Sequence, residues 1–506
     1  MSEYTIALDV GTSSMRAIVF RNDGSILHTA ASEYHTIFPE PSYVEQEPDT
    51  WISTATDVLK RTAIYLTEES IAANAISVTS QRASMIPMGA GDKPLGNAIM
   101  WQDKRTIDIC DRLIEMYGLQ RFYRKTGLRV NPFFVLNKII WLREERPEIF
   151  KKTKKFIGVQ DLVLHHLTGE YVTDWTQASR TMLMNLETFA WDDYLLQLGE
   201  ITEEQLCRLV PPGSIGGRLT KETAQETGLP AGLPVIVSGG DQQNAAIALG
   251  VVHAGIAEAN TGTGSFVLSF SEKPVFNKDA KVLCQASAVA GKYMAETAIF
   301  NTGAIFRWFK EQFYPDLKME NSPYKIMDDY AAEIPVGSNG VVMLPHFEGS
   351  AAPYWNPMAK GVFFNLGLGT TRAAMTRAIL EGIVLEISQN LALMRDMIGE
   401  INELSVAGGM VRSDLFCSIQ ADATDATVMR YSTPEASALG SAINAWVTLG
   451  VYKTHDEALT VVAGKPEYFS PNKDNVKNLR DIRARRETLY DALDKGGVYE
   501  KFMFIG

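Results

Sequence analysis

Short apolar runs, helical patterns and turns alternate along the N-terminal part of the chain. Tyr4–Val10, Met15–Phe20 and Ile26–Glu33 have the length and apolar content of strands and follow one another closely. Pro48–Leu66 carries apolar residues at helical spacing, and Ala75–Thr79 is a further strand candidate. Strands interleaved with helices in this way predict an α/β fold.

The second half of the chain opens with a pattern that resembles the first. Residues 7–20 and 257–268 each contain an apolar strand, a Gly-Thr turn and another apolar strand, so Gly11-Thr12 aligns with Gly262-Thr263. Such a repeat predicts duplicated domains that face each other across a cleft. The predicted domains are residues 1–250 and 251–506, with the boundary placed near 248–255.

Between the halves lies an apolar strand that ends in two glycines and an acid. Leu233–Ser238 is the strand, Gly239-Gly240 permits a turn without a Cβ clash, and Asp241 precedes an Ala-rich helix start. This unit would hold one carboxylate at the end of a sheet, where it can accept a proton or bind a cation. An Asp in this place can also be a plain helix N-cap, and this stretch by itself favours neither role.

The Gly-Thr turns are candidate anion-binding sites. In residues 11–14, several backbone N–H and hydroxyl donors can point in one direction and cradle an anion. A plain hairpin turn of small polar residues is the alternative for a single turn. Two such turns on opposite walls of a cleft would grip a polyphosphate, which favours the functional interpretation of both.

Polar residues follow two further predicted strands. Ala75–Thr79 ends in Ser80–Arg82, and Asn97–Trp101 ends in Gln102-Asp103. α/β proteins bind ligands at strand ends along one edge of a sheet, so these side chains are candidate contacts. Trp101 could pack against a sugar-like face. Solvated loops are the alternative interpretation of the charged clusters.

Glycines mark two more turns in the second half. Gly303 precedes a helical pattern, where a glycine allows close backbone approach and an anion at the helix N-terminus. Gly408–Met410 joins a strand to the predicted helix Asp414–Asp422, and bare backbone of this kind suits a nucleotide base or ribose. The sequence contains neither a Walker A pattern nor a Gly-x-Gly-x-x-Gly fingerprint.

Composition narrows the classes of function. A net charge of −12 is unlike the basic surface of a nucleic-acid-binding protein. No apolar run approaches the roughly 20 residues of a membrane span, and the first residues lack the pattern of a signal peptide. The four cysteines are scattered and have no zinc-ligand spacing, which is typical of free thiols. We therefore expect a cytoplasmic protein that binds neither nucleic acid nor a membrane.

The motifs occur in a fixed order at Asp9–Arg16, Gln81-Arg82, Gly239–Gln242, Asn260–Gly264, Gly349–Gly361 and Gly408–Met410. In order and spacing they resemble the FGGY carbohydrate kinases, over nearly the whole chain. The resemblance implies two ribonuclease-H-like domains of the actin-like ATPase type with a central cleft. It implies transfer of the ATP γ-phosphoryl group to a hydroxyl of a small sugar or polyol, with Mg²⁺. A homodimer or homotetramer is a further expectation from the family.

The resemblance also implies roles for single residues. Asp241 is similar to the base that takes the proton from the attacking hydroxyl, and Asp9 to the first-strand carboxylate that holds Mg²⁺ beside Asp241. Thr12 and Ser13 resemble the phosphate-binding turn of the first wall. On the opposite wall, Gly262 and Thr263 resemble the second phosphate-binding turn. Gly303 is similar to the glycine near the phosphates and ribose, and the adenosine contacts are resembled by Gly408, Gly409 and Ser413. The candidates for the acceptor pocket are Gln81, Arg82, Trp101, Asp103, Phe133 and Gln242.

Within the family, Ser80–Arg82, Val130–Phe133 and Gly240–Gln243 look closest to the glycerol kinases. Those kinases carry a Glu and a Tyr where this chain has Ala83 and Phe133. The replacement of two polar contacts by apolar ones leaves a triol fewer partners and more room. We therefore expect a larger acceptor, with a ketopentose such as xylulose or ribulose favoured and glycerol as an alternative.

Two other classes of function are alternatives. A non-catalytic actin-like nucleotide switch would keep the phosphate-binding turns but would not need Asp241 or the polar strand end at Gln81-Arg82. A glycosidase would need a pair of acids across a sugar-binding cleft. The sequence offers no such pair on matched strand ends, and a glycosidase would leave the two Gly-Thr turns unexplained.

Overall fold

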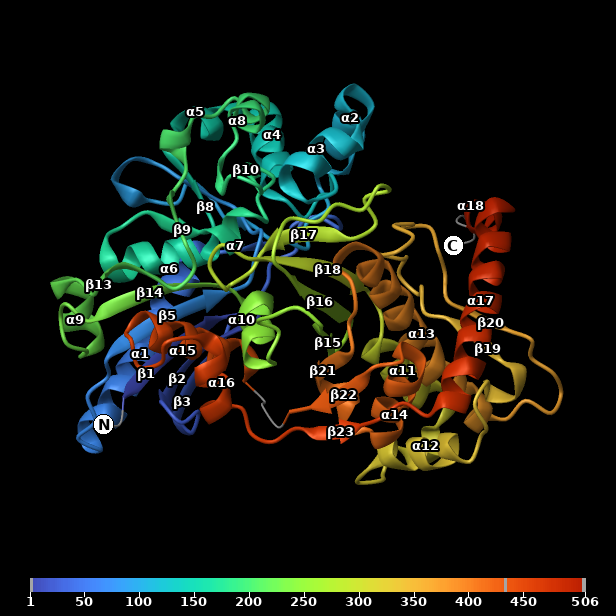
Figure 1. The fold of residues 1–506 in the computed structure, drawn as a ribbon. Helices are drawn as coiled ribbons and strands as arrows, with labels where there is room; N and C mark the ends of the chain where they lie inside the picture. The colour runs from blue at the N-terminus through green and yellow to red at the C-terminus, as the bar shows by residue number, and fades with distance from the viewer. Residues whose placement is uncertain (1–2, 432–434, 503–506) are drawn as a thin grey trace.

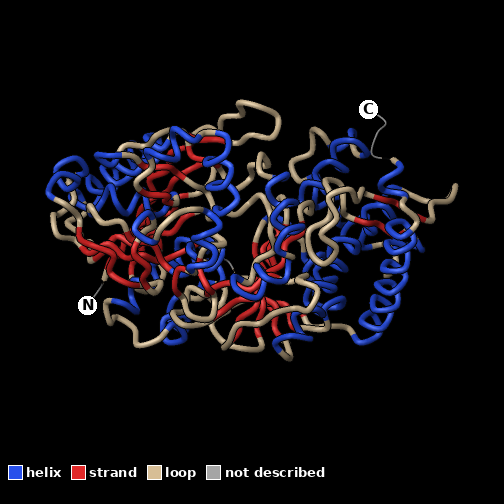
Figure 2. Tube along the Cα trace, turned by 90° about the horizontal axis from the view of Figure 1, so that it is seen from above, coloured by secondary structure: helices blue, strands red, loops and turns tan. Residues whose placement is uncertain are grey.

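The computed structural model describes residues 3–431 and 435–502, which form two α/β halves (Figure 1). The first half is built on a six-stranded sheet of order β13-β14-β5-β1-β2-β3. Its strands are β1 Tyr4–Val10, β2 Ser14–Arg21, β3 Ile26–Glu33, β5 Ala75–Ser80, β13 Ser214–Arg218 and β14 Pro234–Gly240. From above, helices surround the strands of both halves (Figure 2).

The second half is built on a seven-stranded sheet of order β17-β18-β16-β15-β21-β22-β23. Its strands are β15 Ile256–Thr261, β16 Ser265–Ser271, β17 Leu283–Ala286, β18 Tyr293–Ile299, β21 Glu403–Ala407, β22 Thr427–Arg430 and β23 Glu467–Phe469.

Both sheets share one core arrangement. β1 pairs antiparallel with β2 and parallel with β5, β2 pairs antiparallel with β3, and β5 pairs parallel with β14. The same pairings recur among β15, β16, β18, β21 and β22. This is the predicted ribonuclease-H-like duplication, and the Gly11 and Gly262 turns occupy equivalent hairpins in the two halves.

Alternate residues of β1 explain how the first sheet is buried on both faces. Ile6 and Leu8 pack against α1 and α6, whereas Ala7 packs against α10 and α15 on the opposite face. A strand that is covered on both faces carries apolar residues at successive positions. This is why the strand Tyr4–Val10 could be predicted from its apolar run. The helices are α1 Pro48–Glu68, α6 Val159–Thr168, α10 Asp241–Ala248 and α15 Ala436–Thr448.

The packing of α15 connects the two halves. α15 and α16 (His455–Val462) come from the second half of the sequence but lie on the first sheet (Figure 1). Gly440 makes this possible, because a Cβ there would lie 1.8 Å from the carbonyl oxygen of Asn244 in α10. Within the predicted domain 251–506, this segment therefore packs on the first half.

Three helices pack against the second sheet, and their apolar residues form one large core with it. They are α11 Gly303–Phe313, α13 Arg372–Ile398 and α14 Asp414–Thr424. Within the described residues, no helix combines the length and apolarity that crossing a membrane requires.

One predicted strand is much shorter than expected. Within Asn97–Trp101, only Ala98–Ile99 forms a strand (β7), and it pairs with β4 (Glu45–Gln46) in a separate two-stranded sheet. The residues after it therefore do not share the sheet edge at which β5 ends.

Candidate active site

A cavity of about 530 Å³, here called the central cavity, lies between the two halves. Its volume is that of a small-molecule site. From the first half it is lined by residues that include Thr12, Gln81, Arg82, Ala83, Trp101, Phe133, Arg180, Asp241 and Gln242. From the second half it is lined by residues that include Asn260, Gly262, Thr263, Glu296, Phe300 and Trp355.

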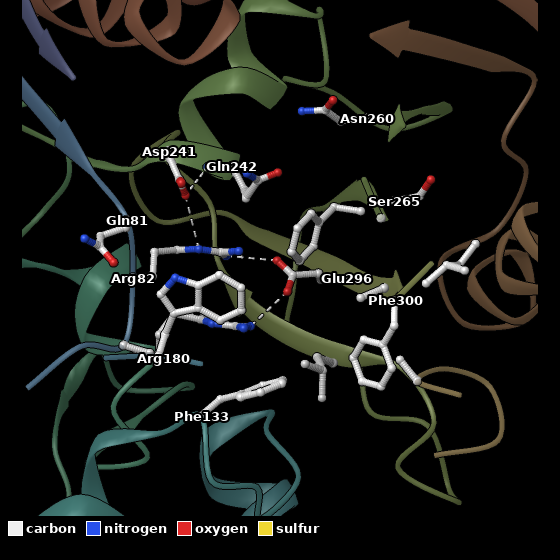
Figure 3. Close-up of a pocket in the computed structure, with 18 of the residues that line it drawn as sticks. Gln81, Arg82, Phe133, Arg180, Asp241, Gln242, Asn260, Ser265, Glu296 and Phe300 are labelled. Carbon is white, nitrogen blue, oxygen red and sulfur yellow. Dashed lines mark hydrogen bonds and ion pairs between the residues drawn. The ribbon is translucent and has the colours of Figure 1, made fainter. Parts of the chain in front are cut away.

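Asp241 is the first residue of α10 and faces the central cavity (Figure 3). Gly240 is the N-cap residue, so the alternative that Asp241 is the cap is wrong. Asp241 Oδ1 does accept the backbone N–H of Gln242 at 2.7 Å. Among the described residues, no hydrogen bond or ion pair engages Oδ2. One carboxylate oxygen is therefore fixed by the helix start while the other is available to a substrate.

The turn before Asp241 requires its glycines. Gly239 has φ +108°, and a Cβ there would lie 2.6 Å from Thr176 Oγ1. A Cβ at Gly240 would lie 2.6 Å from Arg82 Cδ. The glycine pair thus lets the end of β14 pass between α7 (Trp175–Ala178) and the Arg82 side chain.

The floor of the central cavity is a buried ion-pair network that joins the two halves (Figure 3). Arg82 Nη1 donates to Glu296 Oε2 at 2.9 Å and to Gln285 Oε1 at 3.0 Å. Arg180 Nη1 donates to Glu296 Oε1 at 3.0 Å. Arg82 Nε lies 3.5 Å from Asp241 Oδ1, so one guanidinium bridges the two carboxylates.

The network fixes the charges of its members. Burial opposes ionisation of Glu296, but Arg180 and Arg82 overcome it and lower the pKa of Glu296 to about 2. Burial raises the pKa of Asp241, and the Arg82 guanidinium opposes that rise. Burial lowers the pKa of Arg180 to about 10, which keeps it protonated at neutral pH. Two guanidinium groups therefore face two acidic side chains at this floor.

Glu258 is a further buried acid near the network. It lies on β15 in line with Glu296 of β18, with Leu268 of β16 between them. Neither of its carboxylate oxygens has a hydrogen-bond partner among the described residues. Burial raises the pKa of Glu258 well above its usual value, and Glu296 adds to the rise.

Aromatic side chains and one lysine shape the wall of the central cavity. Trp101 and Phe133 pack edge to face with ring centroids 6.0 Å apart. Trp101 Nε1 donates to Thr12 Oγ1 at 3.2 Å. The buried Lys138 Nζ donates to the carbonyl oxygens of Ala83 at 2.6 Å and Phe133 at 2.9 Å. Lys138 thus braces both positions at which the chain departs from the glycerol kinase pattern, including Ala83 at φ +65°.

The structure contradicts the prediction that Asp103 contacts a substrate. Asp103 is buried, and its carboxylate accepts hydrogen bonds from Arg105 and from the backbone N–H of Val44. It does not line the central cavity. The reason is the separate β4–β7 sheet, which directs Trp101 to the cavity but turns Asp103 into the protein.

The other predicted acceptor contacts do line the central cavity. Gln81, Arg82, Trp101, Phe133 and Gln242 all contribute to its wall. Gln81 Nε2 also donates to the carbonyl oxygen of Gly11 at 3.2 Å, which connects the β5 end to the first Gly-Thr turn.

The two Gly-Thr turns reach the central cavity from opposite halves, through Thr12 and through Gly262-Thr263. Among the described residues, no partner accepts the backbone N–H of Thr12, Ser13 or Thr263. Ser13 is exposed beside the cavity rather than lining it. Free N–H groups on facing turns can hold an anion.

A second cavity, of about 1110 Å³, begins where the central cavity ends. Gly262 and Thr263 line both, so this turn forms the boundary between them. The other residues that line the second cavity include Gly303, Phe306, Tyr324, Asp328, Gly409 and Ser413.

Gly303 starts α11 as predicted, but it does not offer a free helix N-terminus. Its N–H donates to Gly262 O at 3.0 Å, and the N–H of Ala304 donates to Thr263 O at 3.2 Å. A Cβ at Gly303 would lie 2.4 Å from Gly262 O. The expectation of an anion on these N–H groups is therefore wrong, and the glycine serves to seat the turn against α11.

The predicted Gly408-Gly409 turn and Ser413 have separate places. Gly408 has φ +97° and packs against Thr261 O, where a Cβ would lie within 2.4 Å. Gly409 lines the second cavity with open space beside its Cα. Ser413 caps α14 by accepting the N–H of Phe416 at 3.1 Å. Gly408 itself does not line the second cavity.

Asp9 lies at the end of β1 near Asp241. Burial and the Asp241 carboxylate raise the pKa of Asp9 to about 7, while Arg16 opposes the rise. Among the described residues, no group donates a hydrogen bond to its carboxylate, and no cluster of three metal-binding side chains occurs. Two neighbouring carboxylates without a cation between them fit a Mg²⁺ ion, which proteins bind through one or two carboxylates plus substrate phosphates.

Sequence reasoning missed Arg180, Glu296 and Lys138. Glu296 stands inside the otherwise apolar strand Tyr293–Ile299, and a charge in such a place must be paired. That signal could have identified it. Lys138 and Arg180 gave no comparable signal.

Two ribonuclease-H-like halves, with a carboxylate and two Gly-Thr turns at their shared cavity, are the arrangement of an actin-like phosphotransferase.

Comparison with known proteins gives the family. Models of the N-terminal and C-terminal domains of the FGGY family of carbohydrate kinases match residues 4–248 and 257–449. The chain belongs to this family. A glycerol kinase of Shewanella oneidensis is 34% identical, over 90% of this chain and 92% of its own. A gluconokinase of Bacillus subtilis is 28% identical, over 95% and 94%.

Solved structures agree with this assignment. The xylulose kinase of Rhodospirillum rubrum is 26% identical and superposes with a TM-score of 0.92, over 97% of this chain and 99% of its own. The protein is therefore an ATP-dependent carbohydrate kinase that phosphorylates a sugar or polyol. The alternatives of a non-catalytic switch and of a glycosidase have no support among these relatives.

Proposed function

We propose that the protein phosphorylates a hydroxyl of a neutral acceptor larger than glycerol, with a ketopentose such as xylulose favoured. The balanced charge of the cavity floor carries this proposal. Arg82 and Arg180 already face Glu296 and Asp241. Among the described residues of this floor, an anionic acceptor would find no unpaired cation, and burying an unpaired charge is costly. Ala83 and Phe133 supply room instead of hydroxyl partners.

In the proposed reaction, Asp241 accepts the proton of the acceptor hydroxyl. The oxygen then attacks the γ-phosphorus of ATP, the bond to the β,γ-bridging oxygen breaks, and ADP leaves. Arg82 holds Asp241 Oδ1, which keeps Oδ2 available for the proton. Proton transfer by a positioned carboxylate typically contributes about 10²–10⁴-fold. Alignment and charge neutralisation supply most of the remaining acceleration.

We place the adenosine of ATP in the second cavity, beside Gly409 and Ser413, and its phosphates at the turn that borders both cavities. Thr263 offers a free N–H group at this turn, and Thr12 and Ser13 offer theirs from the facing turn of the first half. Asp9 and Asp241 would hold Mg²⁺, which neutralises phosphate charge when it is bound. The acceptor would lie against Gln81, Trp101 and Phe133.

A gluconate kinase is the second candidate, because relatives named gluconokinase are 28% identical over 95% of this chain. Glycerol is a third acceptor to test, on account of relatives named glycerol kinase. The balanced charge of the cavity floor favours neutral acceptors over gluconate. The apolar wall at Ala83 and Phe133 favours larger acceptors over glycerol.

The test is a coupled ADP-release assay with glycerol, erythritol, xylulose, ribulose, rhamnulose, fuculose and gluconate at matched concentrations. We expect a ketopentose to give a kcat/KM at least tenfold above gluconate and glycerol, a ratio that corresponds to about 1.4 kcal/mol. A preference for gluconate would refute the charge argument, and a preference for glycerol would refute the account of the wall.

A further inference from the structure

Asn244 lies one helical turn after Asp241 in α10 and is fully buried. Its side-chain amide Nδ2 faces the turn that leads into Asp241. It lies 3.2 Å from the carbonyl oxygens of both Gly239 and Gly240 and 2.9 Å from Thr79 Oγ1. Thr79 Oγ1 in turn donates to Gly239 O at 2.8 Å. The two peptide groups immediately before Asp241 are thus held by a single side chain.

The oxygen of the same amide is held from the other direction. Asn244 Oδ1 accepts from Ser238 Oγ at 3.0 Å and from Asn444 Nδ2 at 3.1 Å. Asn444 lies on α15 and also donates to the backbone oxygen of Ser238 at 3.2 Å. His455 Nε2 lies 2.7 Å from Asn444 Oδ1. A polar chain therefore runs from the start of α16 through α15 to the turn.

This network lies at an irregular point of the sheet. The register between β14 and β5 shifts between Val237 and Gly239, so Ser238 is the extra residue of a bulge. Bulges re-aim the residues that follow them and need support, because the ladder is interrupted there. Gly239 adds a left-handed φ of +108°. Packing also fixes Asn244, because its backbone carbonyl meets Gly440 of α15 at close range.

We infer that Asn244 is a positioning residue that aims Asp241 by holding the carbonyl groups of Gly239 and Gly240. The inference rests on the proposed role of Asp241 as the base. Asn244 contacts neither cavity and does not touch the substrates. Its effect therefore passes through the turn, and the amide is the only part of the side chain that can donate to both carbonyls.

The test is Asn244→Asp, which keeps the shape of the side chain but replaces the amide group that faces both carbonyl oxygens by a carboxyl oxygen. A misplacement of about 1 Å in a reacting group can cost on the order of 10²-fold. We expect kcat to fall by about tenfold to hundredfold, while the KM values for ATP and for the acceptor change by less than about threefold. Asn444→Ala removes the remote partner and should lower kcat less, which provides a second variant if Asn244→Asp folds poorly.

Asn390→Ala is the matched control, because Asn390 is a buried asparagine in α13 whose Nδ2, among the residues that the structure describes, donates only to the backbone oxygen of Ala352. It should lower thermal stability without lowering kcat. A fall in stability after Asn244→Asp with kcat unchanged would show a purely structural role and overturn the inference.

A double-mutant cycle with Asp241→Asn separates the inference from the function on which it rests. If Asn244 acts through Asp241, Asn244→Asp causes no further loss of kcat in the Asp241→Asn enzyme, because residues that act as a unit are non-additive. A full additional loss would mean that Asn244 acts elsewhere. If Asp241→Asn alone retains normal activity, the proposed base is wrong and the inference falls with it. If only Asp241→Asn loses activity, the base is supported and the inference is refuted.

Discussion

The two cavities differ in what builds them. The central cavity is lined by buried side chains that pair across the two halves, with Glu296 of the second sheet holding Arg82 and Arg180 of the first half. The second cavity is lined by the second half alone, by glycines such as Gly303 and Gly409 and by side chains of α12 (Pro323–Ala332) and the start of α14. One cavity therefore depends on side-chain pairing between the halves and the other on elements of a single half. A substitution in one cavity should therefore change ligand binding there more than in the other cavity.

The largest effect should come from the residue at the junction of acceptor and phosphates. Asp241→Asn removes the proton acceptor, and we expect kcat to fall by about 10²–10⁴-fold while ATP still binds. Steady-state assays and calorimetric titration with ATP test both parts. Asp316→Asn, at an exposed ion pair with Arg372, is the control and should leave kcat unchanged. Near-normal activity of Asp241→Asn would contradict the assignment of the base.

A large effect confined to the central cavity should follow Glu296→Gln. Loss of one partner from a buried ion-pair network typically costs about 3–5 kcal/mol. We expect a lower Tm and a raised acceptor KM, with the Kd for ATP nearly unchanged. Glu272→Gln breaks an exposed ion pair with Lys292 at the same sheet and is the control. An equal loss of ATP affinity would show that the two cavities are not separable.

Gly303→Ala should have the opposite effect and weaken ATP binding more than acceptor binding. The added Cβ would lie 2.4 Å from Gly262 O and must displace the turn between the cavities. Overpacking typically costs about 1–3 kcal/mol, so we expect the Kd for ATP to rise about tenfold or more. Calorimetric titration measures this. Gly464→Ala, with open space around its Cα, should change nothing.

A smaller, pH-dependent effect should come from Asp9. Because burial and Asp241 raise its pKa to about 7, the folded chain holds a proton on Asp9 that the unfolded chain releases. Its contribution to stability is therefore present at low pH and is lost as pH rises from about 4 through about 7. Without Mg²⁺, the Tm of the wild type minus that of Asp9→Asn should fall over this range. A difference that rises with pH would contradict the raised pKa.

The smallest effect should come from the acceptor wall. Ala83→Glu combined with Phe133→Tyr restores two polar groups, and we expect a gain of a few fold to tenfold in kcat/KM for glycerol relative to a ketopentose, about 1 kcal/mol. Both single variants serve as controls. No gain on glycerol would mean that Lys138 and the backbone that it braces, rather than these side chains, set acceptor size.

The sequence by itself determined the features that depend on local backbone chemistry. The strand Tyr4–Val10, the two Gly-Thr hairpins and the Gly239-Gly240-Asp241 turn could be predicted because strand periodicity and glycine conformations are local properties. The repeat also predicted two halves of the same topology. In the second cavity the sequence foresaw the turn residues Gly262, Thr263, Gly303 and Gly409 together with Ser413, but not the side chains that α12 (Pro323–Ala332) contributes.

Only the tertiary structure decided which charges meet. Asp103 follows a strand that belongs to a different sheet, so it pairs with Arg105 instead of reaching the cavity. Glu296 and Arg82 are 214 positions apart in the sequence, and α15 returns to the first sheet from the far end of the chain. Pairing over such separations follows from how the two halves pack, which no local pattern encodes. The Gly239-Gly240-Asp241 turn could therefore be predicted from the sequence, whereas the side chains that support it could not.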